Sequence, residues 1–296
     1  MKIYFYLFIL WVCTGCLRLD DNLFNKKQLG AYALEQYDGE QDFKLDGSYA
    51  IAADKITLFT LKSQLPEESK ATMLRAVYIG DTAKIKTDTV ILYCHGNKWH
   101  MDFYWQRAKL LAHAGGKHRY GVLMLDYRGY GMSEGKSTEK SLYHDVDVAM
   151  QWLKARGLRD ERLIGYGFSL GAFPLCELSA QPRSMRPSAL IFEAPYANAS
   201  AMVADASGIA LPSSYVTNLE IDNAEKIKNV YQPLLWIHGS EDHYCKLETQ
   251  GQVVFDHHPG AKESFIIPGA DHDNVPLLAG FESYLTRLAS FIQNPH

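Results

Sequence analysis

The sequence predicts an α/β fold in which a mostly parallel sheet is covered by helices on both faces. Two observations carry this prediction. Short runs of apolar and β-branched residues recur along the chain, and from about residue 89 onward they alternate with helical patterns. Such alternation builds parallel sheets, because each crossover between neighbouring strands carries a helix. The expected strands lie at residues 56–61, 75–79, 89–93, 122–126, 162–166, 189–193, 234–238 and 264–267.

The first two expected strands form an antiparallel pair. Only residues 62–72 separate them, and this polar stretch contains Pro66 and no helical pattern. A short turn of this kind can join antiparallel strands but not parallel ones.

Helices are expected at residues 102–114, 139–155, 170–180, 247–257 and 277–292. In the second of these, Leu142, Val146 and Leu153 belong to an apolar stripe at helical spacing. Thr138 is placed to cap its start and Gly157 to end it.

Composition is that of a globular protein with a substantial core. The 296 residues are 47% hydrophobic and carry a formal net charge of -4. No basic block is present, so we expect no nucleic acid partner. We divide the chain into a leader at 1–16, a tether and N-terminal surface segment at 17–50, and the α/β domain at 51–296, within which 196–231 forms a short cap.

The leader has the features of a bacterial signal peptide. Lys2 is followed by an apolar run at 3–12, which is too short to span a hydrocarbon core of about 30 Å. Gly15 directly before Cys16 resembles a lipobox, so we expect a lipid on Cys16 and a membrane-anchored protein of the cell envelope. Leu17 favours the outer membrane slightly. A cleaved secretory leader, which would give a secreted protein, and a short uncleaved anchor remain alternatives.

Three cysteines lie in the body of the chain, at Cys94, Cys176 and Cys245. An odd and widely spaced set is no disulfide framework. We expect the first two to be small buried residues of the core.

Two segments match G-x-S-x-G, a motif that marks a nucleophilic serine only in the right context. Ser169 follows the expected strand at 162–166 and directly precedes a helix, as a nucleophile elbow requires. Ser133 is followed by a loop, so we interpret it as a chance match or a residue at the edge of the pocket. The same glycines do not open a dinucleotide site, because Leu170 stands where the third glycine is needed.

A serine hydroxyl needs a base and a group that orients the base. His272 and Asp242 each follow an expected strand, in the order Ser, Asp, His along the chain. Both therefore reach the sheet edge where Ser169 lies. Glu241, Asp271 and Asp273 are alternative acids.

An oxyanion hole requires N–H donors aimed at the developing charge. The candidates are the backbone N–H of Leu170, next to the nucleophile, and that of Asn97, in the loop after the third strand. Gly96 allows a close backbone approach there. His95 fits a bracing role in this loop better than a catalytic one.

We expect no metal and no cofactor. The eleven histidines include no H-E-x-x-H or similar ligand spacing.

These residues together resemble the α/β-hydrolase superfamily, and among its members the HGN-type branch, with bud-emergence-like proteins and depalmitoylating abhydrolase thioesterases. The matching segments run from His95-Gly96-Asn97 through Asp126–Gly135, Gly165–Gly171 and His238–Asp242 to Gly269–His272. The resemblance implies an eight-stranded, mostly parallel sheet and a catalytic triad of Ser169, Asp242 and His272. The bulky Lys98-Trp99-His100 depart from the family pattern, and we expect them to narrow the acyl pocket.

The sequence thus predicts a serine hydrolase of the carboxylesterase or thioesterase type, which cleaves a small acyl substrate through an acyl-enzyme. A prolyl-aminopeptidase-type serine peptidase is the alternative enzyme, since it uses the same triad. A non-catalytic, lipid-anchored binding protein on the same fold is the alternative from another class.

Overall fold

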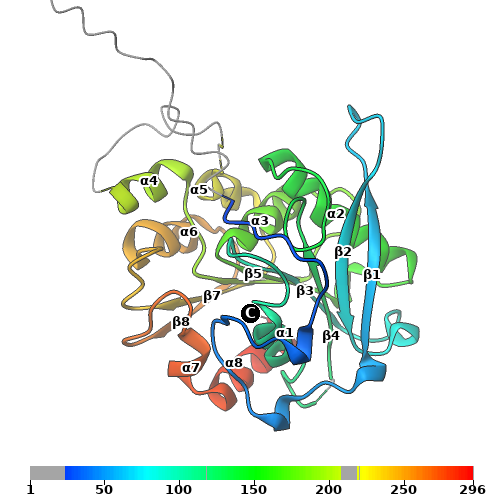
Figure 1. The fold of residues 1–296 in the computed structure, drawn as a ribbon. Coiled ribbons are helices and arrows are strands. Elements are labelled where there is room, and N and C mark those ends of the chain that lie inside the picture. Colours follow the sequence, from blue (N-terminus) through cyan, green and yellow to red (C-terminus); the bar gives the residue numbers. More distant parts are fainter. Residues whose placement is uncertain (1–23, 118, 208–218, 220, 296) are drawn as a thin grey trace, which may run out of the picture.

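A computed structural model of the chain describes residues 24–295, except 118, 208–218 and 220 (Figure 1). The predicted leader and Cys16 lie outside the described residues. Within the described part, no helix combines the length and the apolar character needed to cross a membrane.

The fold is an eight-stranded, mostly parallel sheet, and the predicted fold class is confirmed. The strand order is β1-β2-β4-β3-β5-β6-β7-β8. The β1–β2 and β2–β4 pairs are antiparallel, as predicted for the first pair, and all other pairs are parallel. The strands are β1 (Ile56–Ser63), β2 (Thr72–Ile79), β3 (Val90–Cys94), β4 (Gly121–Asp126), β5 (Leu163–Phe168), β6 (Ala189–Glu193), β7 (Leu234–Gly239) and β8 (Lys262–Ile267).

Helices cover both faces of this sheet (Figure 1). One apolar core lies under α2 and α3, and a second lies under α1 and α8. The central strands β3 to β7 are buried along their whole length, which explains their nearly continuous apolar sequences. The α-helices are α1 (Trp105–Leu111), α2 (Glu139–Ala155), α3 (Ala172–Ala180), α4 (Ala199–Ser207), α5 (Asn223–Lys226), α6 (Gln252–His257), α7 (Val275–Ala279) and α8 (Phe281–Gln293).

Helix α2 has the predicted bounds, and its ends show why. The Thr138 hydroxyl accepts from the backbone N–H of Ser141 at 3.1 Å, and the Ser141 hydroxyl accepts from that of Thr138 at 2.8 Å. This capping box satisfies two N–H groups that the helix itself leaves unpaired, and such caps are worth about 1 kcal/mol each. Gly157 follows the helix with φ +85°, a conformation that glycine adopts without strain.

The helix predicted at residues 277–292 is in fact two helices, α7 and α8. Gly280 separates them, because its φ of +77° lies outside the helical region. The helix predicted at 247–257 begins with a π-helical turn, Leu247–Gly251, before α6.

The N-terminal segment packs on the domain over the part that is described, residues 24–50. Its described residues form two short 3-10 turns, Leu34–Gln36 and Gly47–Tyr49, and isolated β-bridges from Lys26 and Gln28 to the domain. The segment buries Phe24, Leu34 and Phe43 in the two cores. Asp102 anchors it by accepting hydrogen bonds from the backbone N–H groups of Ala33 and Leu34. In Figure 1 this segment, in dark blue, runs across the face of the molecule that is drawn.

The region predicted as a cap, 196–231, contains α4 and α5 among its described residues. An isolated β-bridge joins Asn198 to Asp222 and brings the two ends of the region together.

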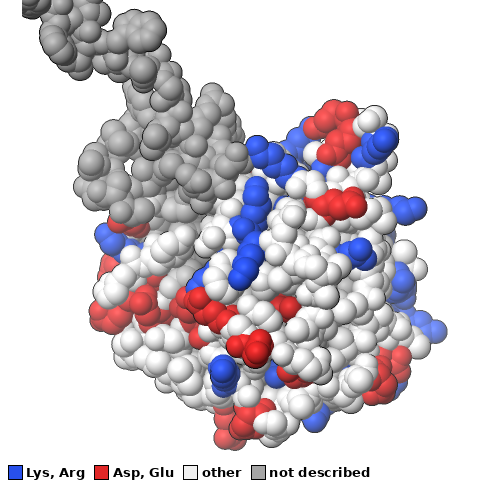
Figure 2. Space-filling view, in the orientation of Figure 1, with Lys and Arg blue, Asp and Glu red and all other residues white. Residues whose placement is uncertain are grey.

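On the face of the molecule in Figure 2, basic and acidic side chains are interspersed with uncharged surface.

Candidate active site

Ser169 occupies a sharp turn between β5 and α3. Its φ of +52° lies in the left-handed region, which is strained for a residue with a side chain. The two flanking residues must be glycine, because a side chain at either position would clash with neighbouring backbone. A Cβ at Gly167 would lie 2.6 Å from the Cα of Ala172, and one at Gly171 would lie 1.9 Å from the carbonyl oxygen of Cys94. The motif therefore folds as the elbow that the sequence predicts.

The Ser169 side chain is buried. Among the described residues its Oγ makes no hydrogen bond of normal geometry, and the Tyr196 hydroxyl is the polar group that interacts with it. A buried polar atom without such a bond is rare and calls for an explanation. Ser133, from the second G-x-S-x-G match, differs in this respect. Its hydroxyl donates to the carbonyl of Asp126 at 2.6 Å and accepts from the N–H of Arg75 at 2.8 Å, so it braces two neighbouring strands.

His272 and Asp242 meet beside Ser169, from the loops that follow β8 and β7. His272 Nδ1 lies 2.8 Å from Asp242 Oδ2. The other carboxylate oxygen, Oδ1, accepts hydrogen bonds from the backbone N–H groups of Tyr244 at 2.9 Å and Cys245 at 2.6 Å. The imidazole packs against the ring of Phe168, with a centroid distance of 5.1 Å. The carboxylate is thus held on both oxygens, and it aligns the imidazole.

The alternative acids do not contact the His272 ring. Asp271 accepts hydrogen bonds from the backbone N–H groups of His243 and His272. Glu241 is exposed to solvent. Asp273 acts on His272 only through its charge.

The ionisation of this pair follows from burial and hydrogen bonding. Burial favours the neutral form of each group, but donors from His238, His272 and Cys245 outweigh it and lower the pKa of Asp242 below its ordinary value. For His272, burial lowers the pKa, whereas the hydrogen bond and charge of Asp242, with the charges of Asp273 and Glu193, raise it. The net result is a pKa of His272 above 6.5.

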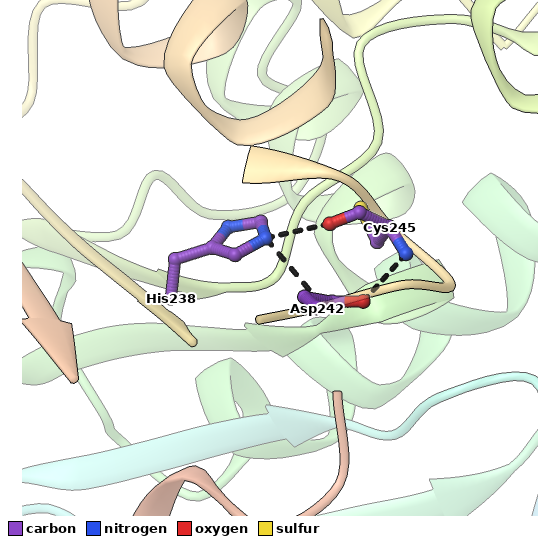
Figure 3. Close-up of side chains that lie close together, drawn as sticks. All are labelled: His238, Asp242 and Cys245. Atoms are coloured by element: carbon purple, nitrogen blue, oxygen red, sulfur yellow. Dashed lines mark hydrogen bonds and ion pairs between the residues drawn. The ribbon is translucent and has the colours of Figure 1, made fainter. Parts of the chain in front are cut away.

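His238, which the sequence did not single out, also faces Asp242 (Figure 3). Trp236 Nε1 donates to His238 Nδ1 at 3.0 Å, so the ring proton must be on Nε2. Nε2 lies 2.7 Å from the carbonyl oxygen of Cys245 and 3.4 Å from Asp242 Oδ2. His238 therefore lies near the same carboxylate oxygen that holds His272.

The side chains of His238, Asp242 and Cys245 lie close enough to resemble a metal-ligand set, with one ligand atom from each within 4.8 Å of the others. Their donor atoms are already committed to other partners. Both ring nitrogens of His238 are hydrogen-bonded, and Asp242 holds His272. Burial raises the pKa of the Cys245 thiol, whereas a metal requires the thiolate. These three residues do not fit a metal site.

Asn97 is held in the loop after β3. Its Oδ1 accepts from the Tyr130 hydroxyl at 2.7 Å and from the N–H of Asn25 at 3.0 Å. His95 braces this loop from beneath, as predicted. Its Nδ1 lies 2.7 Å from the carbonyl oxygen of Gly96, and its Nε2 lies 3.2 Å from Asp126 Oδ1.

Two cavities lie next to each other at the nucleophile elbow, one lined by Ser169 and the other by the following residue, Leu170. The larger is a cleft of about 540 Å³ lined by Ser169 and His272 together with aromatic and polar side chains. The smaller, of about 60 Å³, is apolar and begins at Leu170. Asn97 and Tyr244 line both cavities. Of the bulky residues after Asn97, Lys98 lines the cleft, whereas Trp99 and His100 line neither cavity, so the predicted narrowing by these two is wrong.

A buried arginine supports the site from below. Arg107 Nη1 donates to Glu193 Oε1 at 2.7 Å, and Nη2 donates to the backbone carbonyl of Asp273, next to His272, at 3.1 Å. Nε reaches Asp42 of the N-terminal segment at 3.0 Å. Burial raises the pKa of Asp42 to about 7, although Arg107 opposes this shift. Arg107 thus joins three segments beneath the cleft.

Comparison with known proteins agrees with this fold. A family model described as "Serine aminopeptidase, S33" matches residues 85–223. Alpha/beta hydrolase domain-containing protein 17C of Mus musculus is 31% identical over 207 residues, which cover 69% of this chain and 59% of that protein. The chain belongs to the α/β-hydrolase superfamily.

Alpha/beta hydrolase domain-containing protein 17B of Homo sapiens is also similar. It is 31% identical over 205 residues, which cover 68% of this chain and 65% of that protein. The match therefore spans less than two thirds of the length of either relative.

Solved structures share the α/β-hydrolase fold at low sequence identity. The esterase Pf2001 of Pyrococcus furiosus superposes with a TM-score of 0.62 at 19% identity, over 81% of this chain and 90% of that chain. The esterase Est1E of Butyrivibrio proteoclasticus, bound to ferulic acid, superposes with a TM-score of 0.60 at 16% identity, over 76% and 96%. An acylaminoacyl peptidase of Pyrococcus horikoshii superposes with a TM-score of 0.57 at 17% identity, over 82% and 42%.

Proposed function

We propose that this α/β-hydrolase cleaves a carboxylic ester or thioester through an acyl-enzyme on Ser169. One observation carries the proposal. A strained, buried serine whose Oγ makes no hydrogen bond of normal geometry within the described part of the chain lines the same cleft as a histidine whose Nδ1 is held 2.8 Å from a buried aspartate. Strain and a buried polar atom without a regular hydrogen bond are retained where chemistry uses them.

His272 would act as the base. Asp242 accepts a hydrogen bond from Nδ1–H, so the lone pair of Nε2 is left to take the proton from Ser169 Oγ as this oxygen attacks the carbonyl carbon. The imidazolium then returns the proton to the leaving alcohol or thiol. In the second half, His272 activates a water molecule that hydrolyses the acyl-enzyme and frees the serine.

The backbone N–H groups of Leu170 and Asn97 would stabilise the oxyanion. Leu170 follows the nucleophile directly, and Asn97 lines the cleft from a loop held in place by Tyr130 and Asn25. Donors on such a fixed framework are already oriented when charge develops, and one is typically worth about 10²–10³ in kcat.

Peptide hydrolysis is the second candidate, because the matching family model is described as a serine aminopeptidase. The acidic Asp271 and Asp273 that line the cleft are suited to a substrate amine. Turnover of aminoacyl p-nitroanilides at rates above those of esters would favour it. A non-catalytic binding role predicts turnover of neither class.

The test is hydrolysis of p-nitrophenyl esters and acyl thioesters by the purified full-length protein. Ser169→Ala should lose activity by several orders of magnitude, since loss of a triad member typically costs about 10³–10⁶. Ser133→Ala, in the second G-x-S-x-G match, is the matched control and should keep its rate if circular dichroism shows an intact fold. Equal rates for wild type and Ser169→Ala would contradict the proposal.

We further propose that Cys16 carries a lipid that anchors the protein in the cell envelope. Support comes from the apolar run at 3–12 and from Gly15 before the cysteine. Growth of expressing bacteria with an alkyne fatty acid should label the wild-type protein and not Cys16→Ser. Equal labelling of both would contradict the anchor.

A further inference from the structure

The small apolar cavity beside Ser169 has a size and position that limit the substrate. We infer that it binds the acyl group, and that it restricts the enzyme to short, unbranched acyl chains of about two to four carbons. The inference rests on the proposed function and narrows its substrate class.

The position of the cavity follows from the residues that line it. It begins at Leu170, directly after the nucleophile, and shares Asn97 with the cleft. These residues would supply the two oxyanion donors, so a carbonyl oxygen bound there places the carbonyl carbon where both cavities meet. The two remaining substituents of that carbon must then occupy different spaces. One enters the small cavity and the other enters the cleft.

The chemistry of the walls decides which substituent goes where. Apart from Asn97 and the tyrosines Tyr196 and Tyr244, the walls of the small cavity are apolar side chains: Phe24, Leu170, Phe173, Met202, Leu219 and Ile221. A hydrocarbon tail is stabilised there by its removal from water. The cleft combines aromatic walls with charged and polar side chains, and the latter are Lys98, His243, Asp271 and Asp273. Polar groups of a leaving alcohol or thiol are satisfied there, and the products can escape.

The volume limits the chain length. An apolar cavity of roughly 150 Å³ can hold benzene, or about 25 Å³ per carbon. By this measure about 60 Å³ accommodates two or three carbons beyond the carbonyl. Phe173, Ile221 and Leu170 are 1%, 3% and 4% exposed, so these walls are fixed by the core behind them. Met202 is only partly buried, so its truncation should cost the fold less than truncation of these three walls.

The test is a series of p-nitrophenyl esters from acetate to palmitate with the full-length enzyme, using Ser169→Ala as the blank. Each methylene that enters the cavity should raise kcat/KM by about fourfold. The rate constant should therefore rise from acetate to propionate or butyrate and fall at least tenfold by octanoate. A maximum at octanoate or longer would overturn the inference while the proposed function stands.

Substitutions of residues that line the small cavity test the inference more directly. Met202→Ala enlarges the cavity and should move the preferred chain one or two carbons longer. Met132→Ala makes the same truncation at a partly buried methionine in a separate surface groove, and should leave the profile unchanged. Ile221→Phe fills the cavity and should depress butyrate at least tenfold relative to acetate.

An unchanged chain-length profile in both Met202→Ala and Ile221→Phe, with thermal unfolding showing folded protein, would overturn the inference. Turnover of no ester or thioester by wild type would instead overturn the proposed function, and the inference with it.

Discussion

The imidazole Nδ1 of His272 and the carboxylate Oδ2 of Asp242 are 2.8 Å apart, although 30 residues separate them in the sequence. Parallel strands explain the contact. β7 and β8 are neighbours, so the loops that follow them leave the sheet at the same edge, where the turn after β5 presents Ser169.

Replacement of Asp242 tests whether this contact orients the base. Asp242→Asn should keep the shape of the loop but stabilise the wrong tautomer of His272, and kcat should fall by about 10⁴ with little change in KM. Glu241→Gln, at the neighbouring exposed acid, is the control and should behave as wild type. Ester hydrolysis measures both, and a loss of less than tenfold in Asp242→Asn would exclude the assigned role.

The pH dependence of kcat/KM reports the base. His272 must be neutral to accept a proton, and its pKa lies above 6.5, so the rate should rise with pH through a midpoint above 6.5. The charge of Asp273 contributes to this increase. Asp273→Asn should therefore move the midpoint to lower pH. A midpoint well below 6.5 in the wild type would contradict this account.

His238 is expected to position Asp242 through Oδ2, the carboxylate oxygen that also holds His272. His238→Ala removes the N–H that lies 3.4 Å from Oδ2, and kcat/KM should fall by about tenfold, because a hydrogen bond to a charged group is worth about 1.5–3 kcal/mol. The carboxylate becomes more basic, so the midpoint of the pH profile should move upward. Trp236→Phe removes the N–H that fixes the tautomer of His238 but keeps an aromatic ring at this position. It should therefore lower kcat/KM and raise the midpoint of the pH profile by less than His238→Ala does. Wild-type kinetics in His238→Ala would refute the role.

Arg107 is expected to stabilise the fold beneath the site. Arg107→Met would leave Glu193 and Asp42 buried without their cation, and removal of one partner from a buried pair typically costs about 3–5 kcal/mol of unfolding free energy. Arg183→Met breaks the partly exposed pair with Glu177 and should cost less than about 1 kcal/mol. Urea unfolding followed by circular dichroism compares the two, and equal losses would contradict this prediction.

The sequence predicts the sheet well because burial on both faces leaves continuous apolar runs. The strand at Ala189–Glu193 and helix α2 have the predicted bounds. The sequence does not predict the break at Gly280. A single glycine destabilises a helix by only about 1 kcal/mol, and the apolar periodicity continues on both sides of it.

Some residues of the site can be predicted from the sequence and others cannot. Ser169, Asp242 and His272 could be placed because each follows a strand that ends at one sheet edge. Asn25 and Arg107 could not, because their contacts join segments far apart in the chain and follow no periodicity. The support from His238 depends on a tautomer that Trp236 sets, which spacing alone does not reveal.

The most direct test of the central claim is covalent labelling of the full-length protein with a fluorophosphonate, followed by peptide mass spectrometry. We predict one adduct per chain, on Ser169, formed slowly or not at all in His272→Ala and absent in Ser169→Ala. Labelling of a different residue, or equal labelling of wild type and His272→Ala, would contradict the assignment of Ser169 as a nucleophile activated by His272.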